Sequence, residues 1–308
     1  ITVLIVNFVY QRLNWIQVFE TLRKLNVLWF SLGVLLQGIG LSLAAVRWQR
    51  LLLYQGIPLT VQFSFRLLLI GQFFNLFYLG SMGGDIARFV GLSRRLQNRK
   101  TQVILSLIQD RLIGLGALLL LLTGLISGHR FILTESTISW LFLWGVPGAC
   151  LAFFGGALIL WRWKARPDNK SWIKRQLSGN HRFSILQDPL PHPIFGLTMV
   201  LSLGNHILVF SAGMMVAWAI GIDISFSVAG IILGVTALML SLPITIAGLG
   251  VRDGVILWLM GLFGFSSTTA ALGLSCCLLV INLWWALIGG LLFIYSNATR
   301  SAPDDIGG

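Results

Sequence analysis

The stretch YLGSMGGDIARFVG, residues 78–91, interrupts an apolar segment and decides how the rest of the chain is interpreted. It follows LLLIGQFFNLF at 67–77 and brings several glycines, then Asp85 and Arg88, to a place where lipid is expected. An uncompensated charge at the bilayer centre costs several kcal/mol, so a charged residue there is a functional hypothesis by default. Asp85 and Arg88 are three positions apart and lie on the same face of a helix, which predicts that they pair.

The composition around this stretch indicates a polytopic membrane protein. Of 308 residues, 56% are hydrophobic and only 10% are charged, whereas soluble domains carry about 25% charged residues, and the mean hydropathy is +0.85. Backbone in lipid must satisfy its own hydrogen bonds, so the apolar segments are expected to be helices. These segments are 1–10, 27–46, 67–85, 101–127, 138–161, 194–220, 227–263 and 267–296. Residues 1–308 are therefore predicted to form a single all-α, multi-pass transmembrane domain in the inner (plasma) membrane of the cell.

The net charge of +12 has two possible meanings. In a soluble protein it would favour nucleic acid as a partner, but here the positive residues lie mainly between apolar segments, which the positive-inside rule explains. No nucleic-acid partner is therefore expected. The basic loop at 162–193 is predicted to be cytoplasmic, either a solvated connector or a surface for anionic lipids or another protein. Residues 297–308 are predicted to be a flexible tail.

Cysteine and histidine give no sign of a metal or cofactor. Cys150, Cys276 and Cys277 all lie in apolar segments, and the histidines are scattered along the chain without ligand spacing. Neither a disulfide framework nor a metal site is predicted, and no cofactor is expected. His206, inside an apolar segment, is interpreted as a hydrogen-bonded core residue.

Short motifs recur about half a chain apart and predict two repeated halves. GIPLTVQFSF at 56–65 parallels GIDISFSVAG at 221–230, and LGSMGGD at 79–85 parallels IAGLGVRD at 246–253. Each half has the pattern helix, helix, interrupted segment, helix. The predicted halves are 1–127 and 138–296.

The interrupted segments, 67–85 and 227–263, either turn back within the membrane or cross it. Turning back would make the two halves inverted, whereas crossing would make them parallel. Apolar segments broken by glycine or proline at corresponding places in two halves are typical of transporter sites. Gln72, Asn75 and the glycines favour a re-entrant segment in the first half.

Two further acid–arginine pairs lie in or beside apolar segments, Asp110-Arg111 and Arg252-Asp253. Sequence neighbours do not face each other on a helix, so each of these residues is expected to have its partner elsewhere. One interpretation is structural: the charges neutralise one another and lock helices together. The other is a binding site, because glycine-rich turns permit φ > 0 and aim N–H groups at an anion, and arginine adds bidentate phosphate contacts. The candidate lipid-binding residues are Gly83, Gly84, Asp85, Arg88, Asp110, Arg111, Gly248, Gly250, Arg252 and Asp253; no catalytic or metal-binding residue is predicted.

The same residues carry a resemblance to a known family. GSMGGDIAR at 80–88, Asp110-Arg111, PITIAGLGVRDG at 243–254 and RWQRLL at 47–52 resemble motifs of the lysylphosphatidylglycerol synthase transmembrane region, or flippase-like, family. Asp253 stands where the family has glutamate, and the stretch from Ile281 to Trp284 lacks an arginine that the family often has in its last helix. The resemblance implies movement of polar or charged lipids. The aminoacyl-transferase domain fused in some members is not expected here, so the chain is not expected to synthesise aminoacyl lipid.

Three functions are compatible with these patterns. The first is a flippase or lipid-binding transporter for a phospholipid or polyprenyl-linked lipid, with the headgroup phosphate near Arg88, Arg111 and Arg252, between the two interrupted segments. The others are a membrane glycosyltransferase or its accessory subunit, and a structural subunit of a membrane complex. The expected partners are membrane lipids with anionic headgroups, with a membrane enzyme or a second copy of the chain as further possibilities. Trp284 and Trp285 lie too deep for an interfacial belt and are expected to pack a helix interface or line a lipid path.

Overall fold

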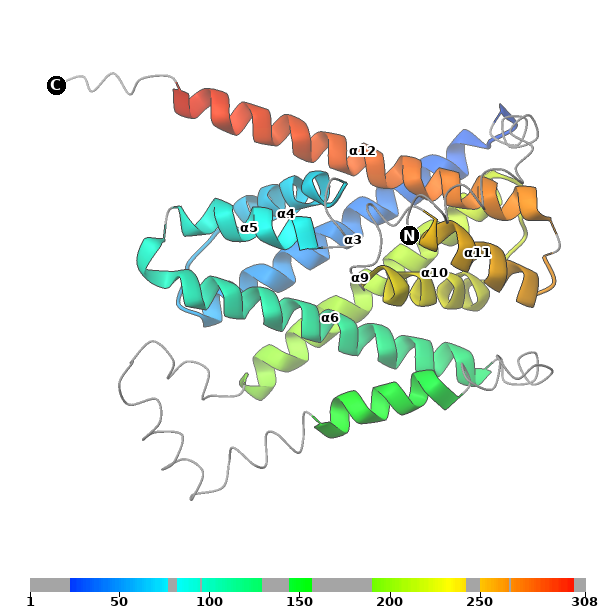
Figure 1. The fold of residues 1–308 in the computed structure, drawn as a ribbon, viewed down its shortest axis with the longest axis horizontal. Helices are drawn as coiled ribbons and strands as arrows, with labels where there is room; N and C mark the ends of the chain where they lie inside the picture. Colours follow the sequence, from blue (N-terminus) through cyan, green and yellow to red (C-terminus); the bar gives the residue numbers. More distant parts are fainter. Residues whose placement is uncertain are drawn as a thin grey trace.

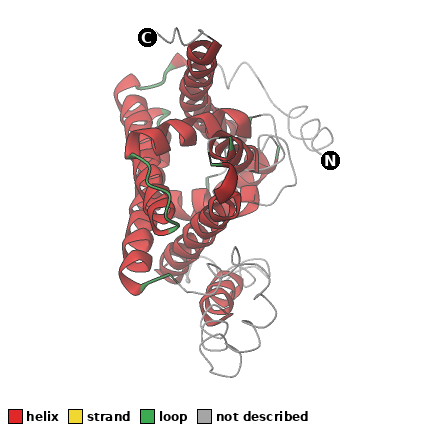
Figure 2. Ribbon diagram, turned by 90° about the vertical axis from the view of Figure 1, so that its left-hand side faces the viewer, coloured by secondary structure: helices red, strands yellow, loops and turns green. Residues whose placement is uncertain are grey.

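The computed structural model describes residues 23–76, 82–94, 96–128, 144–156, 190–241, 250–265 and 267–301. Within these ranges the chain consists of helices and short connecting loops, without a strand (Figure 2). The predicted all-α fold is therefore confirmed. Most of the predicted basic loop at 162–193 lies outside the described residues.

The helices follow the same order of lengths in both halves. A helix of 28 residues is followed by two short helices and another long one, with 15, 12 and 29 residues in the first half and 16, 12 and 34 in the second. Four of them, α3, α6, α9 and α12, are long and apolar enough to cross a membrane. α12 extends into the predicted tail. The described helices are α3 (Val27–Tyr54), α4 (Val61–Asn75), α5 (Met82–Ser93), the 3-10 helix η1 (Gln97–Arg99), α6 (Lys100–Gly128), the short helix Trp144–Gly156, α9 (His192–Ala219), α10 (Phe226–Ser241), α11 (Val251–Leu262) and α12 (Thr268–Ser301).

The predicted apolar segment 27–46 ends too early, because α3 continues through Arg47 to Tyr54. α4 then begins at Val61, so helix also occupies much of the stretch between the predicted segments 27–46 and 67–85. Arg47 is buried inside this helix, and Asp110 of α6 accepts a hydrogen bond from its guanidinium group. A buried charge that is paired and hydrogen-bonded in this way no longer has to leave the apolar environment.

α4 and α5 form a helical hairpin in place of one interrupted segment at 67–85. With 15 and 12 residues, these helices are about 22 and 18 Å long, too short for a hydrocarbon layer of about 30 Å. They pack against each other, and Arg99, after α5, donates a hydrogen bond to the carbonyl of Gly56, before α4. The hairpin therefore begins and ends at the same end of the molecule, on the left in Figure 1. This is the geometry of a re-entrant segment.

α10 and α11 form the corresponding hairpin at the other end of the molecule. α3 and α9 pack along each other in opposite directions, since the N–H of Asn26, the N-cap of α3, donates to the carbonyl of Ala219, the last residue of α9, over 2.8 Å. α4 follows the C-terminal end of α3, and α10 follows the C-terminal end of α9. The α4–α5 and α10–α11 hairpins therefore start from opposite ends of the molecule (Figure 1). An inverted repeat would have this arrangement; the repeat itself stays a prediction.

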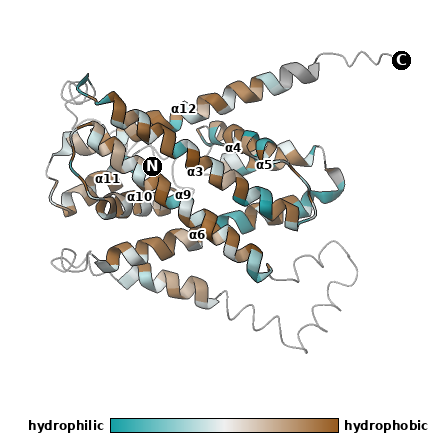
Figure 3. Cartoon of the chain, turned by 180° about the vertical axis from the view of Figure 1, so that it is seen from behind, coloured by the Kyte–Doolittle hydropathy of each residue, from teal (hydrophilic) through white to brown (hydrophobic). Residues whose placement is uncertain are grey.

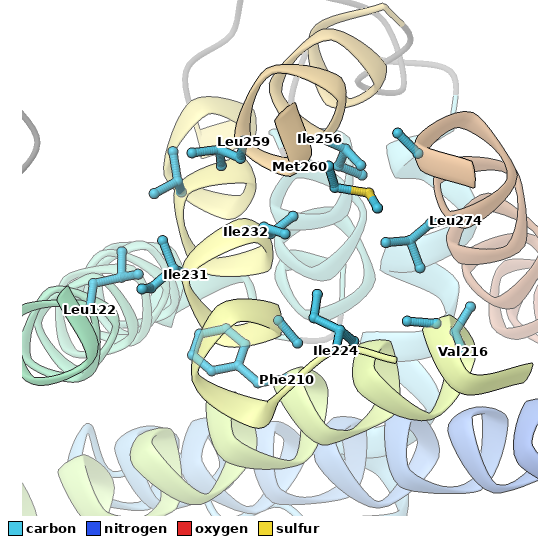
Figure 4. Packing of buried hydrophobic residues seen from close by; sticks show 14 of the residues in the cluster. Leu122, Phe210, Val216, Ile224, Ile231, Ile232, Ile256, Leu259, Met260 and Leu274 are labelled. Carbon is cyan, nitrogen blue, oxygen red and sulfur yellow. The ribbon is translucent and has the colours of Figure 1, made fainter. Parts of the chain in front are cut away.

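The two halves are packed into each other. α4 of the first half packs on α12 of the second, and α10 of the second half packs on α6 of the first. The largest buried cluster draws side chains from α6, α9, α10, α11 and α12, including Leu122, Phe210, Ile232, Met260 and Leu274 (Figure 4). Each short hairpin is therefore held in place by helices of the other half.

Apolar residues predominate along the long helices (Figure 3), and many of them are exposed. Leu35 on α3, Val200 on α9 and Leu291 on α12 expose 58%, 65% and 68% of their surface. Soluble monomers rarely expose large contiguous apolar patches, whereas lipid tails are as apolar as leucine. This surface fits a bilayer.

A glycine in α12 sets how closely α12 approaches α4. A Cβ atom on Gly289 would overlap the backbone carbonyl of Leu69, which has no rotamer by which to move away. We expect Gly289→Ala to lower the free energy of unfolding by about 1–3 kcal/mol, the cost of overpacking, measured by thermal denaturation in detergent micelles. Gly124→Ala on α6 is the matched control, because a Cβ there meets nothing within 4 Å and alanine favours a helix. Equal stability of the two variants would contradict this packing.

Candidate functional site

Charged side chains from three helices form one network in the first half. Asp110 on α6 accepts hydrogen bonds from Arg47 Nε on α3 at 2.7 Å and from Arg88 Nη1 on α5 at 3.3 Å. Asp85 on α5 accepts from Arg88 and from Arg111 on α6. The predicted pairing of Asp85 with Arg88 is confirmed, and Asp110 and Arg111 have partners other than each other, as expected. These five residues are called the first-half network below.

A tryptophan and a serine fix the network to the surrounding helices. Arg47 Nη1 donates to Ser202 Oγ on α9 at 2.9 Å. The guanidinium carbon of Arg88 lies 5.0 Å from the ring centroid of Trp48, a cation–π distance. Trp48 is completely buried and donates from its indole to Ser106 Oγ at 3.3 Å. The arginines are therefore held in defined positions between α3, α6 and α9.

The first-half network carries more positive than negative charge. Its three arginines face two aspartates, so the five residues together have a formal charge of +1. The side chains of Arg47 and Asp110 are only 9% and 6% exposed, whereas that of Arg111 is 38% exposed. Arg111 is thus the part of the network that an anion reaches most easily.

The second half places a smaller network at the start of α11. Arg252 donates from Nε to Ser275 Oγ on α12 at 3.0 Å and from Nη2 to Asp253 Oδ1 at 3.4 Å. Ser275 donates in turn to Asp253 Oδ1, and the Gly250 N–H donates to Asp253 Oδ2 at 3.1 Å. The expectation that Arg252 and Asp253 do not contact each other is wrong, because the flexible arginine reaches its neighbour and Ser275 bridges the two side chains.

A cavity of ≈ 170 Å³ lies beside Arg252, between α3, α9, α10 and α12. The Arg252 side chain is only 7% exposed, yet in the described part of the chain its Nη1 has no hydrogen-bond partner while Nε and Nη2 are both engaged. Gln37 and Asn282 add amide groups to the lining, and the other walls are mainly apolar, such as Leu233 and Ile281. The arrangement offers charged and neutral hydrogen-bond donors to an anion surrounded by hydrocarbon.

The comparison with known families agrees with this membrane architecture. The family model described as Lysylphosphatidylglycerol synthase TM region matches residues 1–294. The chain belongs to this family. It is therefore a membrane protein of lipid metabolism or transport. A search of curated proteins found no significant match to the chain.

The candidate glycines do not all have the expected conformation. Gly83 and Gly84 lie in the first turn of α5 and not in a turn with positive φ. Among the described candidates, Gly250 alone has left-handed backbone, with φ of 81°, where it forms the N-cap of α11. Gly248 lies outside the described residues. Gly83 and Gly84 therefore belong to the helix and not to the turn that was expected to lead into it.

The N–H groups of two of these glycines are occupied by side chains. Gly84 donates to Asn75 Oδ1 at 2.6 Å, and Gly250 donates to Asp253. The first N–H groups of a helix lack partners within the helix and need them from elsewhere, which these side chains supply, so neither group is left for an anion. Gly84 has a packing role instead: a Cβ on it would lie 3.0 Å from the carbonyl oxygen of Gly71, where α4 and α5 approach closely.

The predicted residues form two groups and not one two-sided site. Arg47 of the first-half network contacts α9 at Ser202, whereas the Arg252 cavity touches α9 at Val209 and α3 at Gln37. Gln37 and Arg47 are about 15 Å apart along α3. One phosphate therefore does not contact both groups in this conformation, which corrects the expectation of a single site near Arg88, Arg111 and Arg252.

Several residues of the two groups were not among the predicted site residues. Arg47 and Trp48 lie in RWQRLL, whose family resemblance is a usable signal, but an end of the helix was expected just before them. Ser202 and Ser275 have no distinguishing sequence context, and each contacts a residue far away in the chain.

Proposed function

We propose that the protein is a lipid flippase or lipid-binding transporter that handles a phospholipid or polyprenyl-linked lipid through its anionic headgroup. The observation that carries this proposal is Arg252, a nearly buried arginine that lines a cavity and has one guanidinium nitrogen without a partner in the described chain. Intramembrane arginines mark substrate pathways when they face a cavity. A phosphate oxygen is a natural acceptor for this nitrogen.

The neighbours of Arg252 suit it to reversible binding. Ser275 and Asp253 hold Nε and Nη2, so the guanidinium group has a fixed orientation before a ligand arrives. The Asp253 carboxylate keeps the arginine tolerable inside the membrane when the cavity holds no anion. Transport requires binding that is strong enough to select a headgroup and weak enough to release it, and a partly neutralised arginine meets both needs.

We propose the first-half network as a second position for the headgroup. Its excess positive charge and the partial exposure of Arg111 support this role. The offset of about 15 Å along α3 between Gln37 and Arg47 is about half of a hydrocarbon core of about 30 Å. A headgroup that moved from one position to the other would therefore cross about half of the hydrocarbon core.

The glycosyltransferase alternative gains no support from the geometry. It would need a carboxylate that acts as general base. Asp85 and Asp110, its candidates, each accept hydrogen bonds from two arginines, which occupy the carboxylate oxygens that would have to accept the proton of the substrate hydroxyl.

A reconstitution experiment tests the proposal. The purified protein is placed in liposomes with fluorescent phosphatidylglycerol or fluorescent phosphatidylcholine, and a membrane-impermeant quencher reports how fast each lipid changes leaflet. We expect protein-dependent movement that is faster for phosphatidylglycerol, because the binding positions are positively charged. Movement no faster than in protein-free liposomes would exclude the flippase proposal, and equal rates for the two lipids would exclude selection by headgroup charge.

A further inference from the structure

Two adjacent tryptophans of α12 have different environments. Trp285 donates from its indole to the carbonyl of Val34 on α3 at 3.3 Å, and its ring fills the space where a Cβ on Gly38 would be. Trp284 is 57% exposed and lines a groove between the same two helices. Trp285 therefore packs a helix interface, and Trp284 lines an open path beside it.

The groove is almost entirely apolar and faces outward. It measures ≈ 240 Å³ and has Ser31 as its one polar side chain. Val280 and Trp284, on its α12 side, are 49% and 57% exposed on the surface that fits a bilayer. Its lining residues are Phe30, Ser31 and Val34 from α3 and Val280, Ile281 and Trp284 from α12.

The groove adjoins the Arg252 cavity. Ile281 lines both spaces and is 3% exposed, so the charged cavity and the apolar groove meet at this buried side chain. Each space alone is smaller than the roughly 300 Å³ at which small-molecule pockets begin, and together they exceed that size. A cationic group at one end and an open apolar channel at the other match the two parts of an anionic lipid.

We propose that the groove between α3 and α12 holds an acyl chain of the lipid whose headgroup binds at Arg252, and that the lipid enters sideways from the bilayer along this seam. The inference rests on the proposed function and adds to it the position of the chain and the entry route. An acyl chain is the occupant that fits, because it is apolar, is present at high concentration on this surface, and is covalently joined to the anion that Arg252 complements.

The seam between α6 and α9, which is the counterpart of the α3–α12 seam in the predicted repeat, is closed by polar contacts. His206 Nε2 on α9 lies 3.0 Å from the carbonyl oxygen of Gly114 on α6, which confirms that His206 is hydrogen-bonded. A Cβ on Gly114 would lie 3.4 Å from Arg47 Nη1, so that guanidinium group also lies against this seam. The groove beside Trp284 instead presents hydrocarbon, and passage of a chain there breaks no hydrogen bond of its lining side chains.

Photo-crosslinking tests the inference. The purified protein is reconstituted in phosphatidylcholine vesicles that contain phosphatidylglycerol with a diazirine on one acyl chain, and adducts are mapped by mass spectrometry after illumination. We expect adducts on Val280, Ile281 or Trp284 and on the facing part of α3. Ser31→Trp, which fills the groove, should lose these adducts. Leu35→Trp, one turn further on α3 at a residue that is 58% exposed and outside the groove lining, should keep them.

The outcomes separate this inference from the proposed function. Two results would overturn the proposal that the groove holds an acyl chain. One is that the wild-type groove is labelled no more than the rest of the apolar surface, and the other is that the groove adducts persist in Ser31→Trp. Normal leaflet exchange in Ser31→Trp would overturn the entry route and leave the flippase proposal intact. Groove adducts without any leaflet exchange would overturn the flippase proposal and keep the groove as a lipid-binding site.

Discussion

Arg252→Gln combined with Asp253→Asn is expected to slow the leaflet exchange of fluorescent phosphatidylglycerol by about 10- to 100-fold, because a hydrogen bond to a charged group contributes about 1.5–3 kcal/mol. Both residues are changed because removal of one partner of a buried pair leaves an uncompensated charge, which lowers the free energy of unfolding by about 3–5 kcal/mol. A slower exchange could then result from unfolding and not from lost binding. The double variant keeps a hydrogen-bonding amide at each position, so the packing around Ser275 is preserved.

Two further variants show whether charge or geometry is responsible. Arg50→Gln removes an exposed arginine of α3 that is outside both groups and should exchange lipid at the wild-type rate. Arg252→Lys keeps the positive charge but loses the planar fork of donors, so its rate should lie between those of wild type and the double variant. A double variant as fast as Arg50→Gln would show that Arg252 does not contact the transported headgroup.

Asp110→Asn is expected to have the largest effect on stability, lowering the free energy of unfolding by about 3–5 kcal/mol. Asp110 is the shared carboxylate of Arg47 and Arg88, and its side chain is only 6% exposed. Without its charge, Arg47 retains Ser202 and Arg88 retains Asp85, but the network then holds three arginines against one aspartate inside the membrane domain. Unfolding in detergent micelles, followed by circular dichroism against temperature or added dodecyl sulfate, measures the loss.

Asp223→Asn is the control for this prediction. Asp223 is an exposed acid in the loop between α9 and α10, and its replacement should change the free energy of unfolding by no more than about 0.5 kcal/mol. Arg47→Met with Asp110→Leu removes a buried ion pair as a unit, and should recover part of the stability lost in Asp110→Asn. If Asp110→Asn were as stable as Asp223→Asn, the first-half network would not be what holds α3, α5 and α6 together.

Local patterns were enough to predict a large part of the architecture. Apolar segments of the right length identified the long helices, and the glycine-rich break before Asp85 identified the hairpin of the first half, since helical periodicity and hydrophobicity are properties of neighbouring residues. The i, i+3 spacing likewise predicted the contact between Asp85 and Arg88. The family followed from short motifs, and the family comparison confirmed it.

An all-α membrane protein of the lysylphosphatidylglycerol synthase TM region family, with charged side chains at the start of a short helix in each half, could thus be predicted from local patterns. Which charges meet depends on how the helices pack. Arg47 and Ser202 are 155 positions apart and Arg252 and Ser275 are 23 apart, so no periodicity links them. The structure also separated the two groups along α3 and gave Trp284 and Trp285 different roles. The reason is that a charge in an apolar environment is stabilised by whichever polar group the packing of distant helices brings within hydrogen-bond distance.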